Sequence, residues 1–176
     1  NGYEYLKAPK QSAVKCTWRY RTAPSAPYTI TALFLADFTG ATPFDGAATG
    51  AGVMLLFRES STGKVIAIRY SVDASNTSSL NFDKWTSSVS YSATYQIYGA
   101  VGVINPGAGQ RLVWMRITND NTNLSVYLSV DGRNWHQYSV NKSKTDFMVG
   151  GPDQVGWGAY CNTSAVVAAL ISWQET

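Results

Sequence analysis

Hydrophobic alternation with a period of two residues runs through nearly the whole chain and constrains its fold more than any other feature. About ten segments show it, and none shows the 3.6-residue period of an amphipathic helix. They span residues 12–22, 28–38, 52–60, 64–72, 94–104, 111–118, 124–130, 135–140, 154–160 and 166–173. Turn-forming stretches such as STGK, NPGAG, NDNTN and GGPDQ separate them. This pattern predicts an all-β fold, an antiparallel two-sheet jelly-roll sandwich.

The length of the chain fits one domain. Its 176 residues are enough to bury a core, and neither a linker nor an internal repeat interrupts them. We therefore expect a single domain over residues 1–176, and, because the chain starts at Asn1 rather than Met, a fragment of a longer or processed protein. Two segments rich in small and polar residues, Phe38–Gly52 and Asp73–Ser88, are predicted to be long loops, where functional residues often lie.

Charge is sparse and dispersed. Charged residues make up 14% of the chain, against an average of about 25% in soluble proteins. Lys15, Arg19 and Arg21 fall on one face of a predicted strand, but no continuous basic stripe exists, so we expect no nucleic-acid binding. No apolar run reaches the length of a membrane span, so we expect no membrane insertion.

Two cysteines, Cys16 and Cys161, lie near opposite ends of the chain. Terminal strands often pair in sandwich folds, so the two thiols could form a disulfide. Two cysteines make no disulfide framework, however, and two buried thiols are the other interpretation.

The stretch SVDGRNWHQ, residues 129–137, contains a strong hairpin signal. Asp131-Gly132 is a preferred pair for a two-residue type I′ turn, which needs positive φ at both positions. Such a turn pairs Leu128 with Trp135, Tyr127 with His136 and Ser125 with Tyr138.

The preceding hairpin can be aligned by its apolar faces. Matching Val113, Met115 and Ile117 with Leu124, Val126 and Leu128 places Ile117 opposite Leu124. The two registers together predict two neighbouring rows on the non-core face: Trp114, Tyr127 and His136 in one, and Arg116, Ser125 and Tyr138 in the other.

These rows predict an aromatic platform with basic and hydroxyl groups. Trp135 is predicted to point into the core beside Leu128, and Trp85, in the second long loop, is a candidate to overhang the platform. A surface of this kind suits sugars, whose apolar faces stack on aromatic rings while Arg and His bind hydroxyls. Coverage of Trp114 and Tyr127 by a loop or by another chain is the alternative interpretation.

Catalytic constellations are missing from the sequence. Glu4, Glu59 and Glu175 are the only glutamates and do not cluster as a glycosidase pair requires. His136 is the only histidine, and no G-x-S-x-G motif accompanies it. Asn119–Asn121 offers oxygens but not the spacing of a calcium loop. We therefore expect no enzyme activity, no metal and no cofactor.

Several longer stretches resemble a known superfamily. GVMLLFRESSTGKVIAIRYS, RLVWMRITNDNTNLSVYLSVDGRNWHQYSV, DQVGWGAYCNTS and AALISW are similar to the concanavalin A-like lectin/glucanase superfamily. They most resemble its laminin G-like jelly-roll modules in phage structural proteins and bacterial surface proteins. SVDGRNW also resembles an Asp-box of sialidase-like propellers, but it is one residue short and occurs once, which excludes a propeller.

The resemblance implies a function in binding. It implies a host-surface glycan or polysaccharide as ligand and a location on the virion surface or outside the cell. It also implies a tail fibre, tailspike or capsid appendage as parent protein, with other virion chains as partners and a possible homotrimer. The alternative is a structural or decoration module that uses the same face for protein contacts, because aromatic residues and Arg are also enriched in interfaces.

Overall fold

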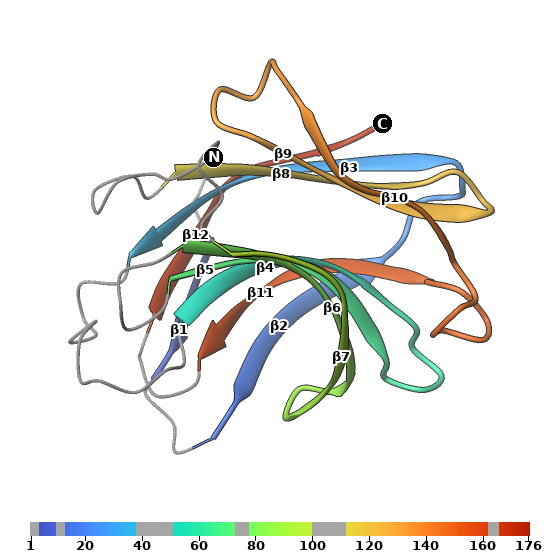
Figure 1. Ribbon diagram of the computed structural model, residues 1–176, viewed down its shortest axis with the longest axis horizontal. Coiled ribbons are helices and arrows are strands. Elements are labelled where there is room, and N and C mark those ends of the chain that lie inside the picture. The colour runs from blue at the N-terminus through green and yellow to red at the C-terminus, as the bar shows by residue number, and fades with distance from the viewer. Residues whose placement is uncertain (1–3, 10–12, 38–50, 73–77, 100–111, 162–165) are drawn as a thin grey trace.

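The protein is a sandwich of two antiparallel β-sheets (Figure 1). The computed structural model describes residues 4–9, 13–37, 51–72, 78–99, 112–161 and 166–176. In these residues there are twelve strands and no helix, so none that could span a membrane either. The first sheet has the order β1 (Glu4–Ala8), β12 (Val166–Glu175), β3 (Tyr28–Asp37), β8 (Leu112–Asn119), β9 (Asn123–Ser129), β10 (His136–Ser143). The second has the order β2 (Lys15–Thr22), β11 (Gln154–Cys161), β4 (Ala51–Arg58), β5 (Val65–Val72), β6 (Ser78–Ser87), β7 (Ser90–Gly99).

The core lies between the two sheets. Alternate side chains of each strand point to the same face, so the period-two pattern places one apolar row per strand in this space. Phe34, Met115 and Ile117 of the first sheet and Leu55 and Ile68 of the second are completely buried in one cluster. The predicted all-β, two-sheet fold is confirmed.

The second sheet is strongly curved, and its concave face points away from the first sheet (Figure 1). Its outermost strands are β2 and β7, yet the backbone N–H of Cys16 donates a hydrogen bond of 2.7 Å to the oxygen of Ser88, between β6 and β7. The sheet therefore curls until its two edges meet. A second buried cluster fills the inside of the curl: Cys16, Met54, Leu56, Val65, Ala67, Trp85 and Tyr160.

The prediction of a long loop over Asp73–Ser88 is wrong in its second half, because residues 78–87 form β6. Leu80 and Phe82 face the inter-sheet core, while Asp83 and Trp85 face the buried concave side. Apolar and polar residues alternate only from Leu80 to Asp83, and Trp85, on the same face as Asp83, breaks the pattern expected of a half-exposed strand. The short β1 was missed as well, and residues 38–50 of the other predicted loop lie outside the described residues.

The two cysteines are free and buried. They belong to neighbouring strands, β2 and β11, but point to opposite faces: Cys16 packs in the concave cluster and Cys161 in the inter-sheet core. Of the two interpretations of the sequence, the structure has the buried thiols. Burial raises the pKa of the Cys16 thiol to about 12.

Candidate functional site

The outer face of the first sheet carries part of the predicted platform. Thr31, Arg116, Tyr127 and Gln137 form a continuous row across β3, β8, β9 and β10, each opposite the next. The Nε of Arg116 donates to the hydroxyl of Thr31 at 2.9 Å, and the side-chain amide of Gln137 donates to the hydroxyl of Tyr127 at 3.1 Å. Partial burial lowers the pKa of the Arg116 guanidinium.

The register between β8 and β9 differs from the prediction by two residues. Trp114 lies opposite Ser129 and Arg116 opposite Tyr127. A two-residue shift keeps every apolar side chain on the core side, so the hydrophobic pattern fits both registers equally well. The turn between the two strands determines which register forms. The Asp120 carboxylate accepts hydrogen bonds from the backbone N–H groups of Thr122 and Asn123, which closes a short turn.

The hairpin between β9 and β10 is not a two-residue turn. Gly132 has a φ of +72°, but Asp131 does not have positive φ, as a type I′ turn requires. Instead, the Asp131 carboxylate accepts the backbone N–H groups of Arg133 and Asn134, and the Ser129 hydroxyl accepts that of Gly132. These bonds stabilise a longer loop and lower the pKa of Asp131 well below its usual range.

The longer loop shifts β10 by one residue, which reverses the faces of its side chains. His136 pairs with Leu128 at the edge of the core-facing side and is exposed, so it is not part of the platform; Gln137 takes the predicted place. Tyr138 is also misplaced in the prediction: it is buried in the core, where its hydroxyl donates to the oxygen of Leu80 at 2.6 Å.

Trp135 lies on the outer face rather than in the core, contrary to the prediction. The Arg116 guanidinium carbon is 3.8 Å from the centre of the Trp135 ring. Gly132 lies over the ring of Trp114 so closely that a Cβ on Gly132 would be 2.8 Å from Cε2 of the indole. The loop thus partly covers Trp114, in agreement with the alternative interpretation of that residue, and brings Trp135 to the platform.

Trp85 is also misplaced in the prediction, because it lies in the concave cluster of the second sheet and not above the first. It is 1% exposed and makes edge contacts with the rings of Tyr91 and Tyr160. Beside it, the Nε of Arg69 is 2.7 Å from the Oδ2 of Asp83, and the Asp83 side chain is fully buried. This ion pair could not be expected from the sequence pattern, in which Asp83 falls in a predicted loop.

The structure therefore brings Trp114, Arg116 and Tyr127 together and separates His136, Tyr138 and Trp85 from them. We define the corrected platform as Trp114, Arg116, Tyr127, Trp135 and Gln137. It combines two indole rings with a planar guanidinium, a phenol and an amide on one face. Ring faces stack on apolar ligand surfaces, and the planar polar groups donate to and accept from hydroxyls.

Comparison with known proteins identifies the fold but not a family. No protein-family model and no curated protein matches the sequence. A functionally unknown protein from Saccharomyces cerevisiae is similar in structure, with a TM-score of 0.59, 13% identity and coverage of 99% of this chain and 88% of the other.

Two proteins of known function share the architecture. A lectin from Bauhinia forficata in complex with GalNAc has a TM-score of 0.52 and 11% identity, with coverage of 98% of this chain and 91% of the lectin. A scytalido-glutamic peptidase with a transition-state analogue inhibitor has a TM-score of 0.51 and 9% identity, with coverage of 82% and 64%. The fold is thus a concanavalin A-like jelly roll, and it occurs in binding proteins and in enzymes alike.

Proposed function

We propose that the chain is a non-catalytic carbohydrate-binding module and that its platform, as defined above, contacts the sugar. The observation that carries the proposal is the stacking of Trp135 on Arg116, with the guanidinium carbon 3.8 Å from the ring centre. Arg116 lies in the same cross-strand row as Tyr127 and Gln137. Sugars present an apolar face and a set of hydroxyls, and this arrangement offers a ring to the first and planar donors and acceptors to the second. The fold it shares with a GalNAc-bound lectin supports the same class of ligand.

A binding role without catalysis agrees with the ion pairs that several carboxylates form. Asp83 is paired with Arg69 and also accepts a hydrogen bond from the Thr94 hydroxyl. Glu4 and Glu175 are paired with Arg19 and Arg21. Glycoside hydrolysis usually needs two carboxyl groups that flank the scissile bond of the substrate.

The proposed setting is the surface of a phage virion or another extracellular surface, with a host-surface glycan as ligand. It follows from the resemblance of the sequence to jelly-roll modules of phage structural proteins.

A glycan array that includes bacterial surface polysaccharides tests the function. The wild-type chain should give hits that free sugar competes away, and Trp135→Ala should lose them. Tyr5→Ala, at a more exposed aromatic residue on β1, should keep them; an array without hits for the folded wild type contradicts the proposal.

The second candidate is a structural module whose platform contacts other virion chains, as in a homotrimer. It is favoured by Leu112, the first residue of β8, and Val130, which follows β9; they are 48% and 50% exposed. Exposed apolar side chains beside Trp and Arg are typical of interface centres. Sedimentation equilibrium distinguishes the two functions, because the structural module predicts a stable oligomer that Leu112→Asp dissociates, whereas a lectin needs none.

A further inference from the structure

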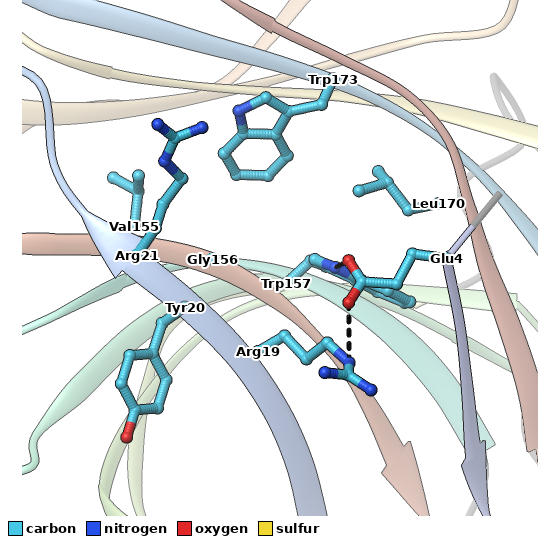
Figure 2. A pocket seen from close by; sticks show the side chains of 9 residues that line it. All are labelled: Glu4, Arg19, Tyr20, Arg21, Val155, Gly156, Trp157, Leu170 and Trp173. Atoms are coloured by element: carbon cyan, nitrogen blue, oxygen red, sulfur yellow. Dashed lines mark hydrogen bonds and ion pairs between the residues drawn. The ribbon is translucent and has the colours of Figure 1, made fainter. Parts of the chain in front are cut away.

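A groove opens between the two sheets at the edge of the sandwich where β1 and β12 face β2 and β11. Its volume is about 400 Å³, within the range of roughly 300–1,000 Å³ found for small-molecule sites. Figure 2 shows its walls: Trp173 and Leu170 on one side, Trp157 and Gly156 on the other, and Arg21, Glu4 and Arg19 at the rim. None of these residues belongs to the platform on the outer face of the first sheet.

Trp173 points into the groove because of an irregularity in β12. The pairing of β12 with β3 shifts between Leu170 and Ser172, which leaves Ile171 unpaired. Leu170 and Trp173 therefore both face the inter-sheet side, although they are three residues apart. Trp173 lies opposite Ala32, whose small side chain leaves room for the indole. Bulges that redirect a side chain in this way are common next to functional sites.

The opposite wall is rigid and apolar. Trp157 is 2% exposed and Val155 is fully buried, so this wall offers the groove only a narrow strip of the Trp157 indole. Trp157 packs against Phe34 of the first sheet, with ring centres 5.8 Å apart. This packing fixes the indole against movement.

Both indoles are held by the same type of contact. Glu4 accepts a hydrogen bond from Nε1 of Trp157 at 3.2 Å and pairs with Nε of Arg19 at 2.8 Å. Glu175 accepts a hydrogen bond from Nε1 of Trp173 at 2.7 Å and pairs with Arg21 at 3.1 Å. Each carboxylate thus links a tryptophan to an arginine, and each ion pair spans the two sheets. The groove is pre-formed, which lowers the entropy lost when a ligand binds.

The charges around the groove balance. Arg19 and Arg21 carry two positive charges, and Glu4 and Glu175 carry two negative charges. A charged ligand would compete with one of these ion pairs, whereas an uncharged ligand leaves both in place. Both arginine side chains are more than half exposed, at 58% and 64%, and each guanidinium has further N–H groups besides the one in its ion pair. These N–H groups are donors for hydroxyl oxygens at the rim.

We propose that this groove binds an uncharged pyranose ring, stacked on Trp173 with its hydroxyls at Arg19, Arg21 and the glutamates. The site is separate from the platform and shares with it only the class of ligand. Its failure therefore leaves the proposed function of the platform untouched, and the reverse also holds.

Indole N–H signals in a nitrogen-15 NMR spectrum test the two sites in one titration. The chain has six tryptophans, and single Trp→Phe variants assign their signals. The probes are methyl glycosides of glucose, galactose, mannose and N-acetylglucosamine at millimolar concentrations. At least one probe should shift the signals of Trp173 and Trp157 in a saturable way. If no probe shifts them, or if only Trp135 and Trp114 respond, the groove proposal is wrong, and in the second case the platform alone binds sugar.

Variants at the rim and the wall complete the test. Trp173→Ala removes the stacking surface and should weaken binding about tenfold. Arg21→Gln, at an exposed position that does not endanger folding, should weaken it severalfold. Arg133→Gln, an exposed change in the β9–β10 loop, is the matched control and should leave the affinity unchanged. Equal affinity of wild type and Arg21→Gln, together with unchanged binding by Trp173→Ala, overturns the proposal.

Discussion

The hydroxyl of Tyr138 in the first sheet donates a hydrogen bond of 2.6 Å to the backbone oxygen of Leu80 in the second. It also lies 3.3 Å from the oxygen of Gln96 on β7. Tyr138 therefore connects β10 with β6 and β7 through the core, at the side of the sandwich opposite the groove. A residue predicted to contact a ligand instead joins the two layers.

Replacement of this hydroxyl should destabilise the fold. We expect Tyr138→Phe to lower the free energy of unfolding by about 1 kcal/mol or more, because the carbonyl of Leu80 is left without its donor in the core. Urea denaturation followed by fluorescence measures the change. Tyr127→Phe, whose hydroxyl is on the half-exposed outer face, should cost much less. Equal losses for the two variants would contradict this role of Tyr138.

The sequence predicted which residues face the core far better than which residues face each other. Val113, Met115 and Ile117 and their partners Leu124, Val126 and Leu128 are all buried, as their alternation indicated. The registers were wrong because side-chain to backbone bonds of Asp120 and Asp131, not apolar matching, determine the two turns. These register errors placed His136 and Tyr138 on the platform, placed Trp135 in the core and left Gln137 out of the predicted site.

The groove could not be predicted from the hydrophobic alternation within single segments of the sequence. Arg19 and Arg21 share a face of a predicted strand, but Glu4 belongs to β1, which the pattern did not reveal, and Glu175 lies at the other end of the chain. The bulge at Ile171 reverses the alternation that would have placed Trp173. Contacts between sheet edges depend on the assembled sandwich, and a single sequence does not contain them.

The buried ion pair of Arg69 and Asp83 should respond asymmetrically to substitution. Arg69→Met leaves the fully buried Asp83 carboxylate without its cation, and we expect a loss of about 3 kcal/mol or more. The double variant Arg69→Met/Asp83→Leu removes both charges and should recover much of that loss. A double-mutant cycle by chemical denaturation measures the coupling. Additive effects of the two substitutions would show that the charges do not interact.

The β9–β10 loop should lose its order in acid. Hydrogen bonds from the backbone of Asn134 and Arg133 hold the pKa of Asp131 below its ordinary value of 3.8. A carboxyl group with a lowered pKa stabilises the folded loop above that value, and the contribution disappears as the pH falls through the folded pKa. The amide signals of Arg133 and Asn134 should therefore titrate at a lower pH than amide signals beside an aspartate whose carboxylate accepts no backbone hydrogen bonds. In Asp131→Asn this titration should be absent; its persistence would assign it to another group.

Two alanine substitutions can distinguish the effect of the contact between Gly132 and the Trp114 ring from the effect of the positive φ at Gly132. Gly132 and Gly63 have nearly the same φ, +72° and +74°. A Cβ at Gly63 would meet nothing closer than 3.9 Å, whereas one at Gly132 would be 2.8 Å from the indole of Trp114. Gly63→Ala should cost about 1–2 kcal/mol for the left-handed backbone alone. Gly132→Ala should cost a further 1 kcal/mol or so, because the ring or the loop must move. It should also raise the solvent exposure of Trp114, seen as a red shift of fluorescence that Trp114→Phe abolishes. Equal stability of the two alanine variants would mean that the loop does not rest on Trp114.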